Sequence, residues 1–99
     1  RWFLIQELLP LLEATADTGA EVRVMSVLSA RTGGPVRFIA PDDLDLKTHY
    51  SLRAAANVAP FHNDLMVEEF ALRHPKIPFM HIFPGFVNTP LPLRSHMPW

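Results

Sequence analysis

The stretch FMHIFPGFVNTPL, residues 79–91, carries the clearest structural signal in this sequence. Its first residues form a short apolar run that, together with Ile77 and Pro78 before them, fits a buried β-strand over residues 77–83. The run stops at Pro84-Gly85, and the polar pair Asn88 and Thr89 follows before another proline. Proline and glycine together mark a turn or loop with a constrained backbone. The stretch therefore predicts a strand that ends abruptly in a defined loop.

Three further segments show regular patterns. Residues 2–17 repeat apolar side chains at helical spacing, with a kink expected at Pro10 because proline removes one backbone donor. Residues 22–29, VRVMSVLS, predict a strand buried on both faces, since apolar and polar residues alternate only weakly. Residues 52–73 predict a helix interrupted by Pro60, which fits near the first turn of its second part. The segment between the first strand and this helix predicts loop, with a short extended piece at VRFI.

The predicted order is helix, strand, helix, strand, which defines an α/β fold. Two strands joined by a helical crossover pair in parallel, and ligands on such sheets bind beyond the carboxyl ends of the strands. This topology brings Ser29 and the segment after Phe83 to the same edge of the sheet. The stretch PGFVNT, residues 84–89, is therefore interpreted as a binding loop, with a plain turn as the alternative.

Composition limits the class of protein. A chain of 99 residues with 48% hydrophobic and 19% charged residues fits one packed domain. The net charge of −1 disfavours nucleic acid, and the absence of cysteine excludes thiolate metal sites. The histidines show no metal-binding spacing, so no metal is predicted. The apolar run at residues 2–12 has no cleavage site and is too short to span a membrane, which predicts a soluble, cytoplasmic protein. Because the chain starts at Arg1 inside a helical pattern, we expect a piece of a longer protein.

These motifs resemble those of the short-chain dehydrogenases/reductases. FPGFVNTPL (residues 83–91) resembles the P-G-x-V-x-T signature after their sixth strand, and VRVMSVLSA (22–30) resembles their fifth strand, which ends on a catalytic serine. DDLDLKTHYS (42–51) resembles a longer linker in a retinol-dehydrogenase-like branch. The order of YSL, NDLMVEEFA and PGFVNTPL is most similar to fungal oxidoreductase-like proteins.

The resemblance implies a fold, a reaction and site residues. Residues 1–99 would form a partial NAD(P)-binding Rossmann-like domain, a doubly wound parallel sheet whose N-terminal cofactor half is missing. The reaction would be hydride transfer between NAD or NADP and a carbonyl or alcohol of a small organic substrate. Ser29 would be catalytic, and the cofactor would bind Pro84, Gly85, the Val87 backbone and the Thr89 side chain. For Ser29 the alternative is a solvated loop serine.

The sequence also departs from this family. Family members carry a Y-x-x-x-K pair, in which the lysine one helical turn later lowers the pKa of the tyrosine. An ungapped comparison puts Ala56 and Pro60 at these positions, a shifted one puts His62 and Met66 there, and no Gly-rich phosphate turn is present. Tyr50 is a candidate relocated acid, with a partly buried loop aromatic as the alternative.

Two interpretations of function therefore stay open. In the first, the chain belongs to an NAD(P)-dependent oxidoreductase and is inactive alone. In the second, it is a catalytically degenerate Rossmann module that binds a nucleotide or a partner subunit. Helices at residues 2–17 and 61–73 would cover the sheet, and the resemblance adds a possible homo-oligomer through them.

Overall fold

The computed structural model describes residues 1–30, 36, 39–85 and 87. Its elements follow the predicted order, with helix α1 at Trp2–Asp17, strand β1 at Val24–Val27, helix α2 at Leu52–Arg73 and strand β2 at Phe79–Ile82. The predicted α/β class is confirmed. The extended piece predicted at VRFI and the polar pair Asn88 and Thr89 fall wholly or partly outside the described residues.

The two strands form a parallel sheet. Val24 lies opposite Phe79 and Val27 lies opposite Ile82. One hydrogen bond continues the ladder beyond the strands, from the Leu28 N–H to the Ile82 carbonyl at 3.0 Å. The strands are shorter than the predicted 22–29 and 77–83, because regular pairing spans four residues on each. This parallel pair with a helical crossover is compatible with part of a Rossmann-like sheet.

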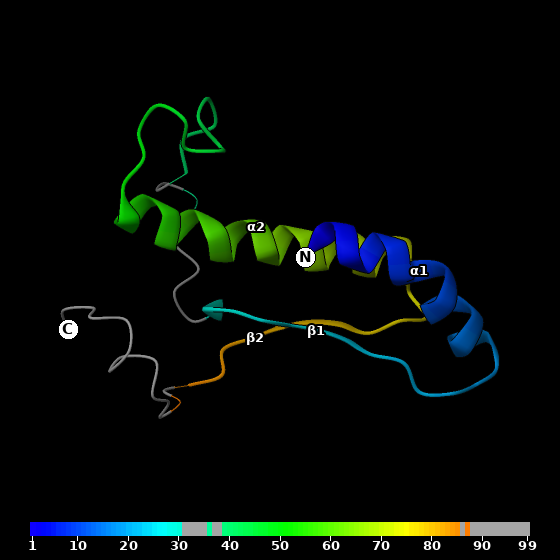
Figure 1. Cartoon of the computed structure of the whole chain (residues 1–99). Helices are drawn as coiled ribbons and strands as arrows, with labels where there is room; N and C mark the ends of the chain where they lie inside the picture. The colour runs from blue at the N-terminus through cyan, green and yellow to red at the C-terminus, as the bar shows by residue number, and fades with distance from the viewer. Residues whose placement is uncertain (31–35, 37–38, 86, 88–99) are drawn as a thin grey trace.

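Both helices lie on the same face of the sheet (Figure 1). Leu9 of α1 packs with Met66 and Phe70 of α2 and with Ile77 in the buried core. An aromatic stack extends this core toward the sheet and toward α1. Phe70 lies 5.5 Å from Phe79 and 4.4 Å from Trp2, measured between ring centroids.

The opposite face of the sheet is exposed along β1 and half-buried along β2 among the described residues. Met25 is 54% exposed and Val27 is 45% exposed, so the prediction that β1 is buried on both faces is wrong. Only the side chains that point toward the helices, such as Ser26, are buried, because α1 and α2 cover one face only.

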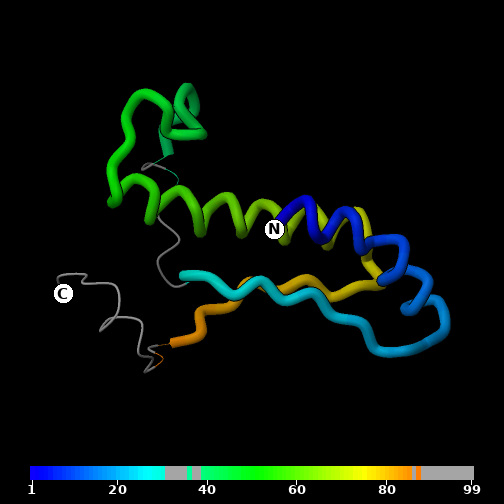
Figure 2. The backbone as a smooth tube through the Cα atoms, in the orientation of Figure 1, coloured from blue at the N-terminus to red at the C-terminus, as the bar shows by residue number. Residues whose placement is uncertain are grey.

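Each helix contains a proline, with different consequences. The axis of α1, which holds Pro10, changes direction along its length, as a proline inside a helix predicts (Figure 2). In contrast, α2 runs without a break through Pro60, so the predicted interruption is wrong. The Pro60 ring is less than 2% exposed, and this burial offsets the lost backbone hydrogen bond. The helix begins at Leu52, as predicted, and Ser51 caps it with a hydroxyl that accepts the Ala54 N–H at 3.0 Å.

Candidate site at the carboxyl edge of the sheet

The parallel register brings the candidate segments to one edge of the sheet. Ser29 lies two residues beyond Val27, and Pro84 lies two residues beyond its partner Ile82. Ser29 is half-buried, whereas Pro84 and Gly85 are exposed. The edge therefore combines a hydroxyl on the β1 side with a constrained turn on the β2 side.

At Gly85 the turn takes a backbone conformation that favours glycine. Its φ of +77° lies in the left-handed region, which side chains other than glycine rarely adopt. A Cβ built on Gly85 would have no atom within 4 Å among its described surroundings. The preference for glycine thus comes from the backbone and not from crowding by the described residues.

The remaining candidates are Val87, Thr89 and Tyr50. Val87 is 64% exposed, and Thr89 lies outside the described residues. Tyr50 directly precedes Ser51, the N-cap residue of α2, and is 66% exposed. The alternative of a partly buried aromatic is therefore wrong.

The positions that correspond to the missing tyrosine and lysine lie inside α2. Ala56 is exposed and Pro60 is buried, while in the shifted comparison His62 is exposed and Met66 is buried. A tyrosine and a lysine that act together need side chains on one face, one helical turn apart. Neither pair offers two ionisable groups in that arrangement.

A buried polar cluster beneath this edge was not predicted. The Ser26 hydroxyl donates to Asn63 Oδ1 at 2.8 Å, and both side chains are buried. His81, opposite Ser26 in the sheet, bonds through Nδ1 to the carboxylate of Asp64. Within the described part of the chain, Asn63 Nδ2 and His81 Nε2 are buried without a hydrogen-bond partner. In the sequence, the indication of this cluster is a serine and a histidine among the mostly apolar residues of the two predicted strands.

The loop before α2 is organised around one carboxylate. Asp43 is 5% exposed and accepts the backbone N–H of Thr48 at 3.1 Å and that of His49 at 2.8 Å. These bonds, led by the one from Thr48, hold the pKa of the Asp43 carboxyl below its usual value. Leu46, at φ +54°, lies within the turn that these bonds close. A loop rich in polar residues thus takes one defined shape.

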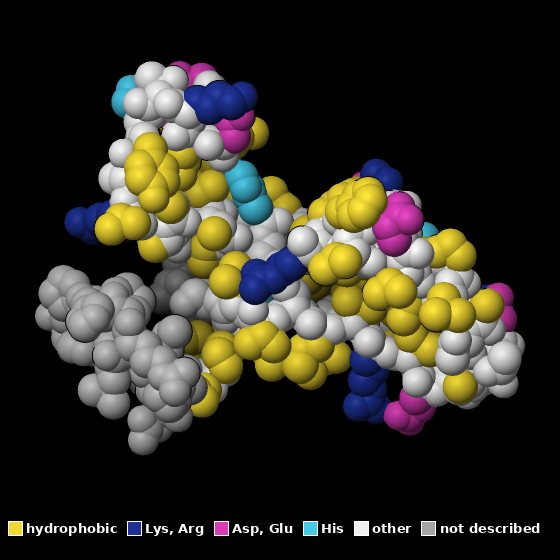
Figure 3. Space-filling view, in the orientation of Figure 1, with side chains coloured by type: hydrophobic (Ala, Val, Ile, Leu, Met, Phe, Trp, Pro, Cys, Tyr) yellow, Lys and Arg dark blue, Asp and Glu magenta, His cyan; other side chains and the backbone are white. Residues whose placement is uncertain are grey.

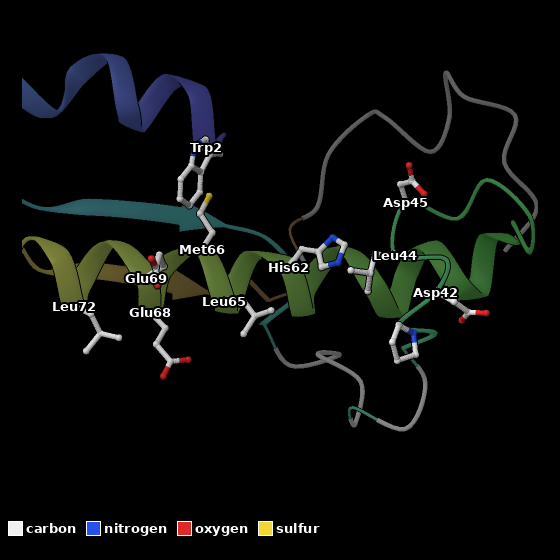
Figure 4. Close-up of a pocket in the computed structure, with 11 residues that line it drawn as sticks. Trp2, Asp42, Leu44, Asp45, His62, Leu65, Met66, Glu68, Glu69 and Leu72 are labelled. Carbon is white, nitrogen blue, oxygen red and sulfur yellow. The ribbon is translucent and has the colours of Figure 1, made fainter.

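A large cavity lies away from the sheet edge. It is an open groove of about 1050 Å³ between α2, the loop at residues 41–45 and the start of α1 (Figure 4). Figure 3 shows the same region as a recess between the lobe formed by this loop and the N-terminal end of α1. We call it the α2 groove, and its apolar lining is Trp2, Leu44, Leu65, Met66 and Leu72.

Comparison with known proteins gives relatives but no fold match. The chain is 40% identical over 89 residues to Oxidoreductase AN1596 of Emericella nidulans, which covers 90% of this chain. It is 40% identical over 90 residues to Oxidoreductase andH of Emericella variicolor, covering 87% of the chain, and 34% identical over 89 residues to Oxidoreductase lepF of Aspergillus flavus, covering 83%. No family model and no solved structure matches.

These relatives support a general class. The chain spans about a quarter of their length, with 25%, 24% and 24% of each covered. The similarity therefore supports an oxidoreductase in the broad sense and agrees with the fungal likeness of the motifs. Within the described residues, neither helix is long and apolar enough to cross a membrane.

Proposed function

We propose that this chain is the middle-to-late part of an NAD(P)-dependent oxidoreductase of the short-chain dehydrogenase/reductase kind. The supporting observation is the parallel register that brings Ser29 and the Pro84-Gly85 turn to one edge of the sheet. Ligands on open α/β sheets bind beyond this edge. The named relatives support oxidoreductase chemistry in general. The hydride transfer, the Rossmann-like sheet and a cytoplasmic location are parts of this proposal.

Each edge residue has a role in this proposal. The open space beside Gly85 admits the nicotinamide ring close to the backbone, while the Val87 backbone and the Thr89 hydroxyl bind its carboxamide. Ser29, on the neighbouring strand, faces the carbonyl or alcohol of the substrate. The phosphate-binding turn belongs to a preceding segment of the longer protein, which also decides between NAD and NADP.

The missing tyrosine and lysine favour a second candidate function. With Ala56 exposed and Pro60 buried, α2 supplies no acid of the expected kind. A degenerate module of this fold would bind a nucleotide, or a partner subunit, without turnover. Cofactor binding with no hydride transfer to any carbonyl tested would favour this candidate.

The decisive experiment compares two substitutions of Gly85 in the longer protein. Gly85→Asn keeps access to the left-handed backbone region, since asparagine tolerates positive φ, but fills the open space. Gly85→Ala adds only a methyl group and a small backbone strain. If the nicotinamide approaches here, Gly85→Asn weakens NADH or NADPH binding more than Gly85→Ala does.

The measurement is a fluorescence titration of each variant with NADH and with NADPH. Thr89→Ala should cost about 1 kcal/mol, the usual scale of one neutral hydrogen bond. Ser29→Ala should leave cofactor affinity unchanged and lower turnover, because in this proposal the Ser29 side chain faces the substrate. Should both Gly85 variants bind cofactor like the parent protein, the loop is only a turn. The 99-residue chain itself should bind neither cofactor at about 1 mM, an affinity near −4 kcal/mol.

A further inference from the structure

Helix α2 holds both strands of the sheet through two consecutive residues. Asn63 Oδ1 accepts a hydrogen bond from the hydroxyl of Ser26 on β1 at 2.8 Å, and the Asp64 carboxylate bonds Nδ1 of His81 on β2. Ser26 and His81 lie opposite each other in the parallel register. The same point of α2 therefore holds the same level of both strands, and we call these four side chains the α2 clamp.

The bond to Asp64 fixes the orientation of a buried ring. The His81 side chain is 4% exposed, whereas that of Asp64 is 52% exposed. Because an ionised carboxylate only accepts hydrogen bonds, Nδ1 of His81 is the donor. Within the described part of the chain Nε2 of the same ring has no partner, so the loss of the Nδ1 bond would leave both ring nitrogens unpaired.

A stiff stretch of backbone connects His81 to the turn that starts at Pro84. The two residues are three positions apart, a distance of about 10 Å along an extended chain. Proline has a fixed φ and keeps the residue before it extended, so Phe83 and Pro84 have little freedom. The Leu28 N–H bonds the Ile82 carbonyl at 3.0 Å and holds the remaining residue in the ladder. A displacement of His81 is therefore carried to the turn.

We propose that Asp64, acting through His81, is a positioning residue for the Pro84-Gly85 turn. This inference rests on the proposed function, which places the nicotinamide at that turn. Asp64 orients the ring of His81, and the ring fixes the end of β2 against α2. Gly85, at φ +77°, turns the chain directly after the proline, so the position of the turn follows that of β2.

Ser26 and Asn63 supply the matched comparison within the same clamp. Their hydrogen bond is also buried, and its loss also leaves a buried polar group unpaired. However, this bond acts on β1, whose end leads to Ser29 and not to the turn. If the clamp only stabilised the fold, breaking either bond would affect cofactor binding alike. If Asp64 positions the turn, breaking the bond between Asp64 and His81 has the larger effect.

The test is a fluorescence titration of the longer protein with NADH and with NADPH. Asp64→Ala removes the acceptor at a half-exposed helical position, where alanine favours the helix and the fold should tolerate the change. Asp64→Asn is its matched control, because the amide oxygen of asparagine still accepts from Nδ1. We expect Asp64→Ala to weaken cofactor binding about tenfold, since small misplacements of a site cost that much or more. Asp64→Asn and Ser26→Ala should bind cofactor like the parent protein.

Substitutions of His81 test the same link from the other end. His81→Asn places an amide N–H near the position of Nδ1, whereas His81→Gln places it near that of Nε2. Because Nδ1 is the nitrogen that bonds Asp64, His81→Asn should retain cofactor affinity and His81→Gln should lose about tenfold. Far-ultraviolet circular dichroism at the assay temperature shows that each variant is folded before it is titrated.

A second measurement follows the turn without any cofactor. In the longer protein made with isotopically labelled glycine, nuclear magnetic resonance detects the Gly85 amide, whose signal is identified by its absence in Gly85→Ala. This signal should move in Asp64→Ala and in His81→Gln. It should stay in place in Asp64→Asn and in Ser26→Ala.

Three results would overturn the proposal. Equal losses of cofactor affinity in Asp64→Ala and Ser26→Ala would show that the clamp only stabilises the fold. An unmoved Gly85 signal in Asp64→Ala would show that the bond does not reach the turn. Unchanged affinity in Asp64→Ala, where Gly85→Asn weakens binding, would show that the turn does not depend on this bond. If the Gly85 signal moves as expected but Gly85→Asn binds cofactor like the parent protein, the positioning of the turn holds and the proposed function fails, so the two failures are distinguishable.

Discussion

The hydrogen bond between Ser26 and Asn63 gives the sharpest test of the fold. It joins β1 to α2 across 37 residues of sequence, at 2.8 Å, between side chains that are 7% and 5% exposed. Ser26→Ala removes the donor and leaves Asn63 Oδ1 buried without a partner, beside an Nδ2 that already lacks one. We expect a loss of about 1–3 kcal/mol in the free energy of unfolding. That is a large share of the roughly 5–15 kcal/mol typical of a domain.

A second substitution should reverse this loss. Asn63→Leu in the Ser26→Ala background replaces both polar partners with apolar side chains and removes both orphaned groups of Asn63. Replacing both members of a buried hydrogen bond is close to neutral, whereas removing one is costly. The double variant should therefore be more stable than Ser26→Ala alone, by about 1 kcal/mol or more.

Urea unfolding followed by far-ultraviolet circular dichroism measures all four members of this cycle. Thr15→Ala serves as a control, because its hydroxyl bonds an exposed backbone carbonyl of its own helix and its loss strands no buried group. The two buried substitutions should couple strongly. If their effects add within about 0.3–0.5 kcal/mol, the two side chains do not interact and this part of the core is wrongly described.

Three further predictions follow from single residues. Phe70→Ala, at a position 1% exposed, should lower the free energy of unfolding by about 3–5 kcal/mol in the same urea assay. A lowered pKa stabilises the folded state above the ordinary value of 3.8, so the amides of Thr48 and His49 should lose protection as the pH falls through the lowered pKa of Asp43. A pH series of hydrogen exchange measures this, and Asp43→Asn should remove the dependence. Val27→Thr, on the exposed face of β1, should reduce self-association in light scattering and change stability by less than about 0.5 kcal/mol.

Local patterns and topological rules predicted the element order, the parallel pairing and the shared edge. These features depend on periodicity within a segment and on the few ways a helical crossover can connect two strands. The continuity of α2 through Pro60 depends instead on tertiary burial of the proline ring, which no local pattern reports. The exposure of Met25 has a similar cause, since a strand pattern shows which side chains favour burial but not whether the chain covers them.

For the candidate site, topology predicted the shared edge, whereas the roles of its residues stay predictions and the source of the proton was not predicted. Reduction of a carbonyl needs a hydride and also an acid within hydrogen-bond reach of the oxygen. Ala56 and Pro60 have no ionisable group, and Pro60 is buried. His81 is buried and its Nδ1 already bonds Asp64, so it lacks contact with the open edge. We therefore expect an oxidoreductase that uses this edge to take its proton donor from a residue other than Ala56, Pro60 and His81. Tyr50, exposed in the loop before α2, is one candidate for this donor.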